Sequence, residues 1–414
     1  MKKTLIILLV VSISIGSLFA ADHDSPIDPT QNEMYSAVLA SFRPTSTRAL
    51  GMGDAALAVS GRSDSFFYNP AALAEGRFQL SLPAASITLY HPADILEKGI
   101  ADKLIQGIKE NDNSKITGAA ADYLGLIKSG KGKLATVDAA MSFTAGGFGL
   151  GVFVQDNVHT YAPSNSTGGL DSNLIDELNV AARLGLGFRI NLPASFSIDL
   201  GVAASFNYLA FSQKVNANDV MTALNDGDVV SYLREQIPIM AGWAVPIDAG
   251  VNINMPFGFT VSAVARNFNG KYSMVAYDNA NQLIPNIMKA PEGAAKYTFN
   301  TDWQLDAGLG WKLKNVFFQP TIAVDVTDII GLAKTKNVTV NDFMYHLNAG
   351  AEIRLLSFLD VRGGLNKGYW SVGAGIDLWA IKIDVAYSWM EFGAKTGDNP
   401  GDALSIRFNI GYDR

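Results

Sequence analysis

The sequence predicts an all-β fold: a transmembrane antiparallel β-barrel of about 14 strands with an N-terminal hatch (plug) in the lumen. Three observations lead to this expectation. Apolar and polar residues alternate along most of the chain, short and long connections separate the alternating segments, and charged residues make up only 17% of the chain. Soluble globular proteins carry about 25% charged residues, so we expect part of this surface to contact something other than water.

The alternation is clearest between residues 178 and 208. Every second residue from Leu178 to Ile190 is apolar, and the pattern resumes from Phe196 to Tyr208 after a break at residues 191–194. A period of two is typical of a strand with one apolar side, and the pair predicts an antiparallel hairpin. Soluble strands average about five or six residues and tilted membrane strands need about nine to eleven, so strands of this length favour a membrane barrel.

The same alternating unit recurs to the end of the chain. Short turns such as Ala145-Gly146 and Pro256-Phe257 alternate with longer connections, as in outer-membrane barrels. A soluble two-sheet sandwich is the alternative, but its water-facing side should carry more Lys and Glu than this chain does. We predict strands near residues 78–90, 136–144, 147–155, 178–190, 195–208, 241–255, 258–268, 298–313, 317–327, 344–356, 358–366, 369–378, 380–389 and 403–412.

The residue types predict which strand face meets lipid. Leu, Val, Phe and Trp fill the apolar face, and aromatic residues near strand ends, such as Phe299 and Trp303, suit the interfacial girdles. The polar face points into the lumen and carries charges of both signs. Because buried charges persist when they are paired, we expect a structural network of lumen ion pairs rather than a selectivity ring. Its predicted members are Arg183, Arg189, Asp199, Asp306, Asp325, Glu352, Arg354, Arg362, Asp384 and Arg407.

The N-terminus predicts export. Lys2 and Lys3 precede an apolar stretch at residues 4–19, and small residues follow at Ala20 and Ala21, a pattern typical of a secretory signal peptide. A membrane anchor is the alternative. The predicted organisation is a signal peptide at residues 1–20, a hatch at 21–76 and the barrel at 77–414, with helical extracellular inserts near 91–133 and 212–236.

The segment before the first strand carries a family resemblance. It is rich in small residues and does not alternate strongly, so we expect it to fill the pore. The sequence RALGMGDAALAVSGRSDSFFYNPAALA, Arg48 to Ala74, closely resembles the N-terminal hatch of FadL-type long-chain fatty-acid transporters of Gram-negative outer membranes. The C-terminal strands look similar to those of that family, whose barrels also have fourteen strands. The chain also resembles FadL-like paralogues of spirochaetes.

The resemblance implies a location and a function. It implies the outer membrane of a diderm bacterium, surrounding outer-membrane lipid, and passive uptake of long-chain fatty acids or similar hydrophobic small molecules, gated by movement of the hatch. No cofactor is implied, and we expect a monomer. A non-transporting barrel that binds a protein or host ligand through its loops is one alternative; a cargo shuttle of the type IX secretion kind is another.

Two groups of hatch residues are candidates for function. An apolar wall for the substrate is expected from Phe66, Phe67 and Tyr68, although these rings could instead only pack the hatch against the barrel. The gate is expected at a second group, in which glycines allow positive φ or a close approach and the Asn-Pro turn is rigid. Its predicted members are Gly51, Gly53, Asn69, Pro70 and Ala71.

Composition and spacing exclude several function classes. The chain has no cysteine, which excludes disulfide scaffolds, iron–sulfur clusters and thiol catalysis, and 39 acidic residues against 32 basic ones disfavour nucleic acid as a partner. The four histidines are scattered without the spacing of a zinc site, so no metal is expected. His159 near Asp156 is the one candidate for a catalytic pair, and a solvated loop histidine is the simpler interpretation. We therefore expect no enzyme.

Overall fold

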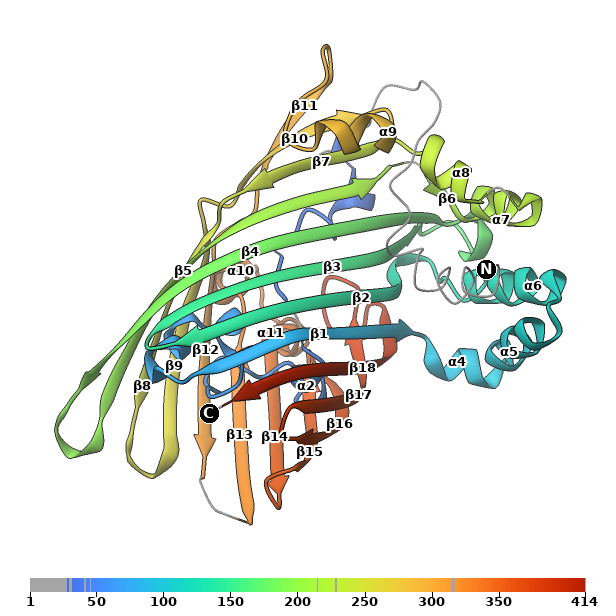
Figure 1. Cartoon of the computed structure of the whole chain (residues 1–414). Helices are drawn as coiled ribbons and strands as arrows, with labels where there is room; N and C mark the ends of the chain where they lie inside the picture. Colours follow the sequence, from blue (N-terminus) through green and yellow to red (C-terminus); the bar gives the residue numbers. More distant parts are fainter. Residues whose placement is uncertain are drawn as a thin grey trace.

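The computed structural model describes residues 28–29, 32–40, 42–44, 46–213, 215–227, 229–313 and 317–413. These residues form a closed antiparallel β-barrel with helices at one end and the hatch inside (Figure 1). The fold class expected from the alternation is confirmed. The predicted signal peptide, residues 1–20, lies outside the described residues.

Fourteen wall strands close the barrel. Its described residues form eighteen hydrogen-bonded segments, and β1 pairs with both β2 and β18, which closes the sheet. Three wall strands are each broken into two segments. The segments β7 and β8 both pair with β5 and together form one wall strand. The next wall strand consists of β9 and β10, and the one after it consists of β11 and β12. The two-residue β6 is an edge addition on β4, so fourteen wall strands remain and the predicted number is confirmed.

The wall strands run in chain order around the barrel. Their bounds are β1 Gln79–Tyr90, β2 Gly130–Ala145, β3 Phe148–Ala162, β4 Asn173–Asn191, β5 Ser197–Ser212, β6 Val215–Asn216, β7 Ile239–Ala244, β8 Ile247–Asn254, β9 Phe259–Phe268, β10 Lys271–Tyr277, β11 Lys296–Asn300, β12 Gln304–Lys312, β13 Phe318–Val326, β14 Leu347–Leu355, β15 Leu359–Asn366, β16 Tyr369–Leu378, β17 Ile381–Glu391 and β18 Pro400–Asp413.

Several strand ends differ from the prediction. The strands β2, β3 and β4 continue beyond the predicted ends at 136, 155 and 178, towards the helices. Their outward residues in these extensions contact protein instead of lipid, so the simple alternation of apolar and polar residues ends before the strand does. The predicted strand at 344–356 begins too early, because residues 340–346 form a helix whose N-terminus has a capping box between Thr339 and Asp342.

The outer face of the barrel is apolar at the middle of the strands. Leu184, Leu186 and Phe188 on β4 are 50–60% exposed, and the neighbouring strands present Leu150 and Val152 in the same way. A closed sheet leaves no backbone edge unpaired, and an apolar outer band suits lipid, so the barrel is transmembrane. Among the described residues no helix is long and apolar enough to span a membrane.

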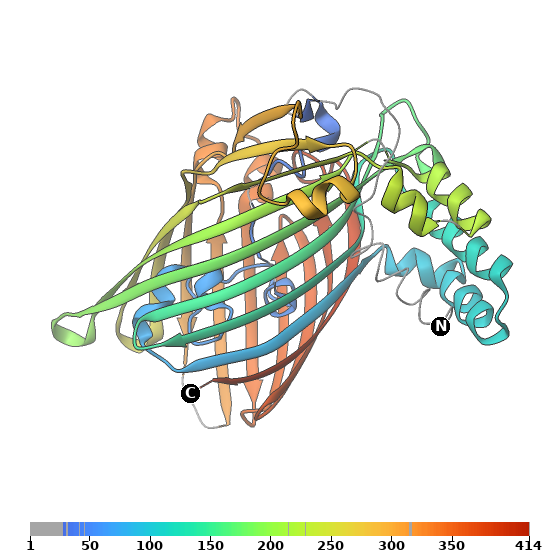
Figure 2. The ribbon, with the colours of Figure 1, turned by 45° about the horizontal axis from the view of Figure 1, so that its top comes forward.

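Helices cover one end of the barrel. Those that follow β1 and β5 lie next to each other beyond the ends of β1–β5, and we call them the helical cap (Figure 2). Asp112 starts α6 by accepting hydrogen bonds from the backbone N–H groups of Ser114 and Lys115. The cap comprises α4 Pro92–Glu97, α5 Ile100–Glu110, α6 Asn113–Leu124, α7 Ala217–Asp226 and α8 Val229–Glu235. Other short helices are η4 Gly169–Asp171, η5 Pro193–Ser195, η6 Pro256–Gly258, α9 Ala280–Leu283, η7 Ile284–Asn286, α10 Ile329–Lys334 and α11 Val340–His346.

The hatch, residues 46–76 of the described chain, lies inside the barrel (Figure 2). It contains the short helices α2 Thr47–Gly51, α3 Ser65–Tyr68 and η3 Pro70–Glu75, and a further helix, η2 Glu33–Tyr35, precedes it. The side chain of Ser46 caps α2 by accepting from the N–H of Ala49, and Asn69 caps η3 by accepting from the N–H of Ala71. These local bonds hold a segment that has little regular structure in a compact form.

Candidate functional site

The Asn-Pro turn of the hatch rests directly on the barrel wall. The amide of Asn69 donates to the carbonyl of Leu57, 3.1 Å away, and to Asn252 Oδ1 on β8, 2.7 Å away. A Cβ atom on Gly201 would overlap Pro70, and one on Gly250 would overlap Asn69. Two wall glycines therefore make the space that this turn occupies.

The two predicted hatch glycines also make close contacts. Gly53 has a φ of +64°, and a Cβ there would overlap the backbone carbonyls of Ala349 and Leu365. Gly51 faces Gly373 on β16, whose Cα lies 3.1 Å from the position of a Cβ on Gly51. Gly53 therefore has a positive φ, and both Gly51 and Gly53 approach the barrel wall closely. Their role in gating stays a prediction.

The predicted substrate wall is packed against the barrel. The side chains of Phe66 and Phe67 lie at the place where a Cβ on Gly151 would be, and the two ring centroids are 4.3 Å apart. The ring of Tyr68 lies under the guanidinium of Arg43, 5.1 Å from the centroid, and its hydroxyl accepts from the N–H of Ser46. All three rings have protein partners on the lumen side, and a contact with substrate stays a prediction.

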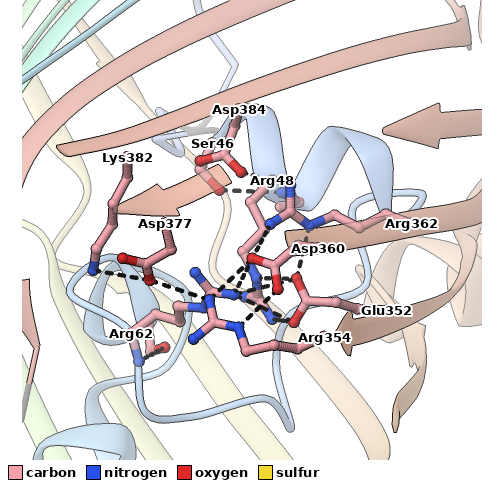
Figure 3. A network of polar contacts seen from close by, with 12 residues as sticks. Ser46, Arg48, Arg62, Glu352, Arg354, Asp360, Arg362, Asp377, Lys382 and Asp384 are labelled. Atoms are coloured by element: carbon pink, nitrogen blue, oxygen red, sulfur yellow. Dashed lines mark hydrogen bonds and ion pairs between the residues drawn. The ribbon is translucent and has the colours of Figure 1, made fainter. Parts of the chain in front are cut away.

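The other half of the hatch is held by charge (Figure 3). Arg48 of the hatch binds Glu352 on β14 through two hydrogen bonds of 2.8 and 3.0 Å, and Arg362 on β15 donates to the same carboxylate at 2.7 Å. Arg62 of the hatch donates to Asp360 at 2.9 Å. Although burial alone lowers the pKa of Arg62, the facing carboxylates raise that pKa well above its ordinary value.

Further wall charges extend this network. Asp360 also accepts two hydrogen bonds from Arg354, and Arg362 Nη1 lies 2.5 Å from Asp384 Oδ1. Arg407 lies across from Asp384 in the register of β17 and β18. Burial raises the pKa of the hatch carboxyl Asp64, but Arg48 and Arg407 overcome this effect, and the pKa lies below its usual value.

The remaining predicted lumen charges bind other partners in the wall and the hatch. Arg189 binds Asp199 through two hydrogen bonds of 2.6 and 2.8 Å, and Arg183 lies 2.8 Å from Asp248. Asp306 accepts from Arg266 at 2.7 Å. The carboxylate of Asp325 accepts the backbone N–H groups of Ala56 and Leu57 in the hatch, at 2.7 and 3.0 Å.

Sequence reasoning missed part of this set. It did not include the hatch residues Arg48 and Arg62, which supply positive charge to the wall carboxylates, or the pair partners Asp248 and Arg266. The available signal was an excess of unmatched carboxylates on β14–β17 beside two arginines in a segment expected to fill the pore. Which arginine meets which carboxylate depends on the path of the hatch, which has no periodic pattern.

An apolar cluster lies in the lumen at the end beside the helical cap. Residues 34–39 lie against the inner face of β4, β5, β7, β10 and β11, and the ring centroids of Tyr35 and Phe211 are 5.5 Å apart. Phe299, which we expected in the lipid girdle, stacks on Tyr272 inside the lumen at 4.9 Å. This expectation was wrong because the break between β11 and β12 reverses the alternation: Phe299 and Asp306 both face inward although their numbers differ in parity.

A cavity of about 240 Å³ lies under the helical cap. It is wider than any single water site and slightly smaller than the usual range of ligand pockets, about 300–1,000 Å³. Its lining is almost wholly apolar and comes from the cap helices and the ends of β1–β6: Leu89, Ile95, Ile100, Ala101, Leu104, Ile116, Ala119, Ala120, Tyr123, Leu124, Leu134, Ala135, Val158, Leu174, Asp176, Ser212, Val215, Val220, Met221, Leu224, Leu233 and Ile237.

Strand alternation places this cavity outside the barrel wall. On β4, the hatch residue Leu73 lies where a Cβ on Gly185 would be, so Gly185 faces the lumen, whereas Leu184 is half exposed on the outer face. Leu174 and Asp176 are an even number of residues from Leu184 and therefore face outward. The sequence-based expectation was an apolar wall formed inside the lumen by Phe66, Phe67 and Tyr68 of the hatch, and this cavity has a different position.

The same reasoning separates the two residues of the possible catalytic pair. His159 faces the lumen, where its Nε2 lies 2.6 Å from Glu177 Oε2. Asp156 is three positions away on β3, so it points to the outer face. The two side chains do not form a pair. The described residues also contain no group of three or more His, Asp or Glu side chains that could hold a metal ion.

Comparisons with known proteins give structural likenesses. No protein-family model matches this chain, and neither does any curated protein sequence. Similar solved structures include the Ralstonia pickettii toluene transporter TbuX, at 12% identity, with 90% of this chain and 98% of that chain covered and a TM-score of 0.45. The Pseudomonas putida toluene transporter TodX has 11% identity, coverage of 90% and 99%, and a TM-score of 0.46.

A Pseudomonas aeruginosa FadL homologue is also similar, at 14% identity, with 89% of this chain and 98% of that chain covered and a TM-score of 0.41. The Arg48 to Ala74 segment resembles the hatch of the same family type. The barrel is established by its own strand pairing.

Proposed function

We propose that this protein is an outer-membrane channel for hydrophobic small molecules and that it is not an enzyme. The observation that carries the proposal is the apolar cavity under the helical cap, because a cavity lined by apolar side chains with few polar groups is the usual form of a binding site for such molecules. The apolar belt of the barrel supports a membrane location. The protein acts as a monomer in the outer membrane of a diderm bacterium.

In this proposal the cap collects the compound and the hatch controls passage through the lumen. The hatch is compact and touches the wall on several sides, which supports its role as the barrier. Passage requires part of it to move, and the Asn-Pro turn at Asn69 and Pro70 is the gate in the proposal. Long-chain fatty acids are the first substrates to test, since the sequence resemblance implies them, and passage is driven by their gradient.

The test is uptake of a labelled long-chain fatty acid, and of a labelled neutral hydrocarbon, by liposomes that contain the purified barrel. The variants are Ala120→Trp, which fills the cap cavity, and Asn69→Ala, which removes a helix cap and one contact with the wall. Loss of such a cap costs about 0.5–2 kcal/mol. Gly363→Ala is the matched control, because the nearest atom to its new Cβ is 3.9 Å away.

We expect saturable uptake of at least one compound in the wild type, reduced uptake with Ala120→Trp, altered uptake with Asn69→Ala and no change with Gly363→Ala. Uptake equal to that of empty liposomes, with a correctly folded barrel, would overturn the proposal. If Ala120→Trp reduces uptake and Asn69→Ala does not alter it, the proposed gate is wrong and the proposed channel function stands.

A further inference from the structure

The polar groups in the cap cavity are acidic or neutral. Among the residues that line it, Asp176, Ser212 and Tyr123 carry polar side-chain groups, and the lining contains no Lys, Arg or His. The hydroxyl of Tyr123 donates to the carbonyl of Leu134 at 2.5 Å. The hydroxyl oxygen of Ser212 already accepts one hydrogen bond, from the backbone N–H of Asp176 at 2.9 Å. The side chain of Asp176 therefore supplies the acceptor of the cavity.

A second carboxyl group lies beside Asp176. Asp156 on β3 faces outward like Asp176, and the two are diagonal neighbours on this face because the strand register pairs Asp156 with Leu178 and Val158 with Asp176. Both residues are buried, with 3% of Asp156 and 8% of Asp176 exposed. Asp176 of this acidic pair lines the cavity and Asp156 lies beside it, which is unusual on an apolar outer surface of a barrel.

The nearby cations are directed elsewhere. Lys133 on β2 points to the lumen, where its Nζ donates to Asn157 Oδ1 at 2.8 Å, and His159 also lies on the lumen side. Lys103 on the cap binds Asp122 at 2.7 Å. A carboxylate group at the floor of the cavity would therefore meet the carboxyl group of Asp176, with Asp156 beside it, in an apolar lining that supplies no cation.

We propose that the cap cavity binds a neutral apolar molecule that donates a hydrogen bond to Asp176, such as an aliphatic alcohol or a phenol, in preference to a fatty-acid anion. This inference rests on the proposed function and narrows its substrate class. A hydroxyl group can donate a hydrogen bond to a carboxyl oxygen of Asp176, whereas an ionised head group must lose its water and faces charge of the same sign. The apolar part of the molecule then lies between the strand ends and the cap helices, next to residues such as Met221 and Leu233.

The test uses the full barrel in phosphatidylcholine vesicles and the fluorescent probe 1-aminoanthracene, displaced by 1-decanol or by decanoate at neutral pH. The two competitors have the same chain length and differ in the head group. In the Ala120→Trp variant the cavity is filled, so loss of probe signal there measures only partition of the competitor into lipid. This value is subtracted from the displacement measured with the wild type. Asp176→Asn removes the charge of the floor, and Asp156→Asn is a second variant if the first does not fold. Asp219→Asn, on the exposed side of α7, is the matched charge control.

We expect decanol to displace the probe at a concentration lower than that of decanoate by about tenfold or more, since like charges brought together cost several kcal/mol. Asp176→Asn or Asp156→Asn should reduce this ratio several-fold, and Asp219→Asn should leave it unchanged. Equal displacement by decanoate, or a ratio that neither floor variant changes, overturns the inference and leaves the proposed function intact. Equal probe binding to the wild type and to Ala120→Trp overturns cavity binding itself, and the proposed function with it.

Discussion

Two parts of the lumen wall hold the N-terminal region by different means. On β14 and β15, Arg48 and Arg62 of the hatch bind the carboxylates of Glu352 and Asp360. On β4, β5, β7, β10 and β11, residues 34–39 pack against a cluster of apolar side chains and aromatic rings. The first contact depends on every partner being present, because a buried charge without its partner is costly, whereas the second loses energy in proportion to the volume removed.

The largest effect is expected at the charged contact. Glu352→Ala leaves Arg48 and Arg362 without their shared carboxylate, and breaking a buried ion pair from one side costs about 3–5 kcal/mol. Hydrogen–deuterium exchange of residues 46–76 in the intact barrel should accelerate by the factor that corresponds to this loss of stabilising free energy. Conductance across a planar bilayer should rise as well, because the hatch opens more often.

The control for this experiment is Lys103→Ala. Lys103 pairs with Asp122 at 2.7 Å on the cap, where both side chains are more than 40% exposed. Such a pair is worth about 0–1 kcal/mol, so exchange of the hatch should not change. Unchanged exchange in the Glu352→Ala variant would contradict the view that charge holds this side of the hatch.

A smaller and more local effect is expected at the apolar contact. Met34→Ala removes a buried side chain from the cluster around Phe211 and Met240, and such changes cost about 2–5 kcal/mol where the site cannot collapse. Exchange at residues 33–39 should accelerate, and exchange at 46–76 should not. The Met34→Ala/Glu352→Ala double variant should show the sum of the two effects, since separate sites usually add. Strong coupling between them would mean that the two contacts act as one unit.

The smallest effect is expected at the glycine contact under the Asn-Pro turn. Gly201→Ala places a methyl group against Pro70, and overpacking of this kind costs about 1–3 kcal/mol. The thermal midpoint of the barrel should fall, and exchange near residue 70 should rise. Gly363→Ala adds the same methyl group to the wall at an open position and should leave both measurements unchanged. Equal effects of the two substitutions would show that the contact with the turn is unimportant.

The sequence predicted the wall well and the contacts across the lumen only in part. Alternation from Leu178 to Ile190 was enough to assign both faces of β4, because a strand with one lipid-facing side has to repeat every two residues. It failed at Phe299, where a break in the strand reverses the faces. It also gave no information on Arg48 and Arg62, because the hatch has no period from which a direction can be derived.

The sequence by itself determined a transmembrane barrel of fourteen strands with a segment in its lumen, because alternation, strand length and turn spacing are local properties of the chain. Only the tertiary structure decided that the apolar cavity lies outside the wall and that Asp176, with Asp156 beside it, lies at this cavity. The physical reason is that an outward residue beyond the lipid can face water or a helix. Whether it faces water or a helix depends on how α4–α8 fold back over the strand ends, and the residue pattern of the strands does not predict this.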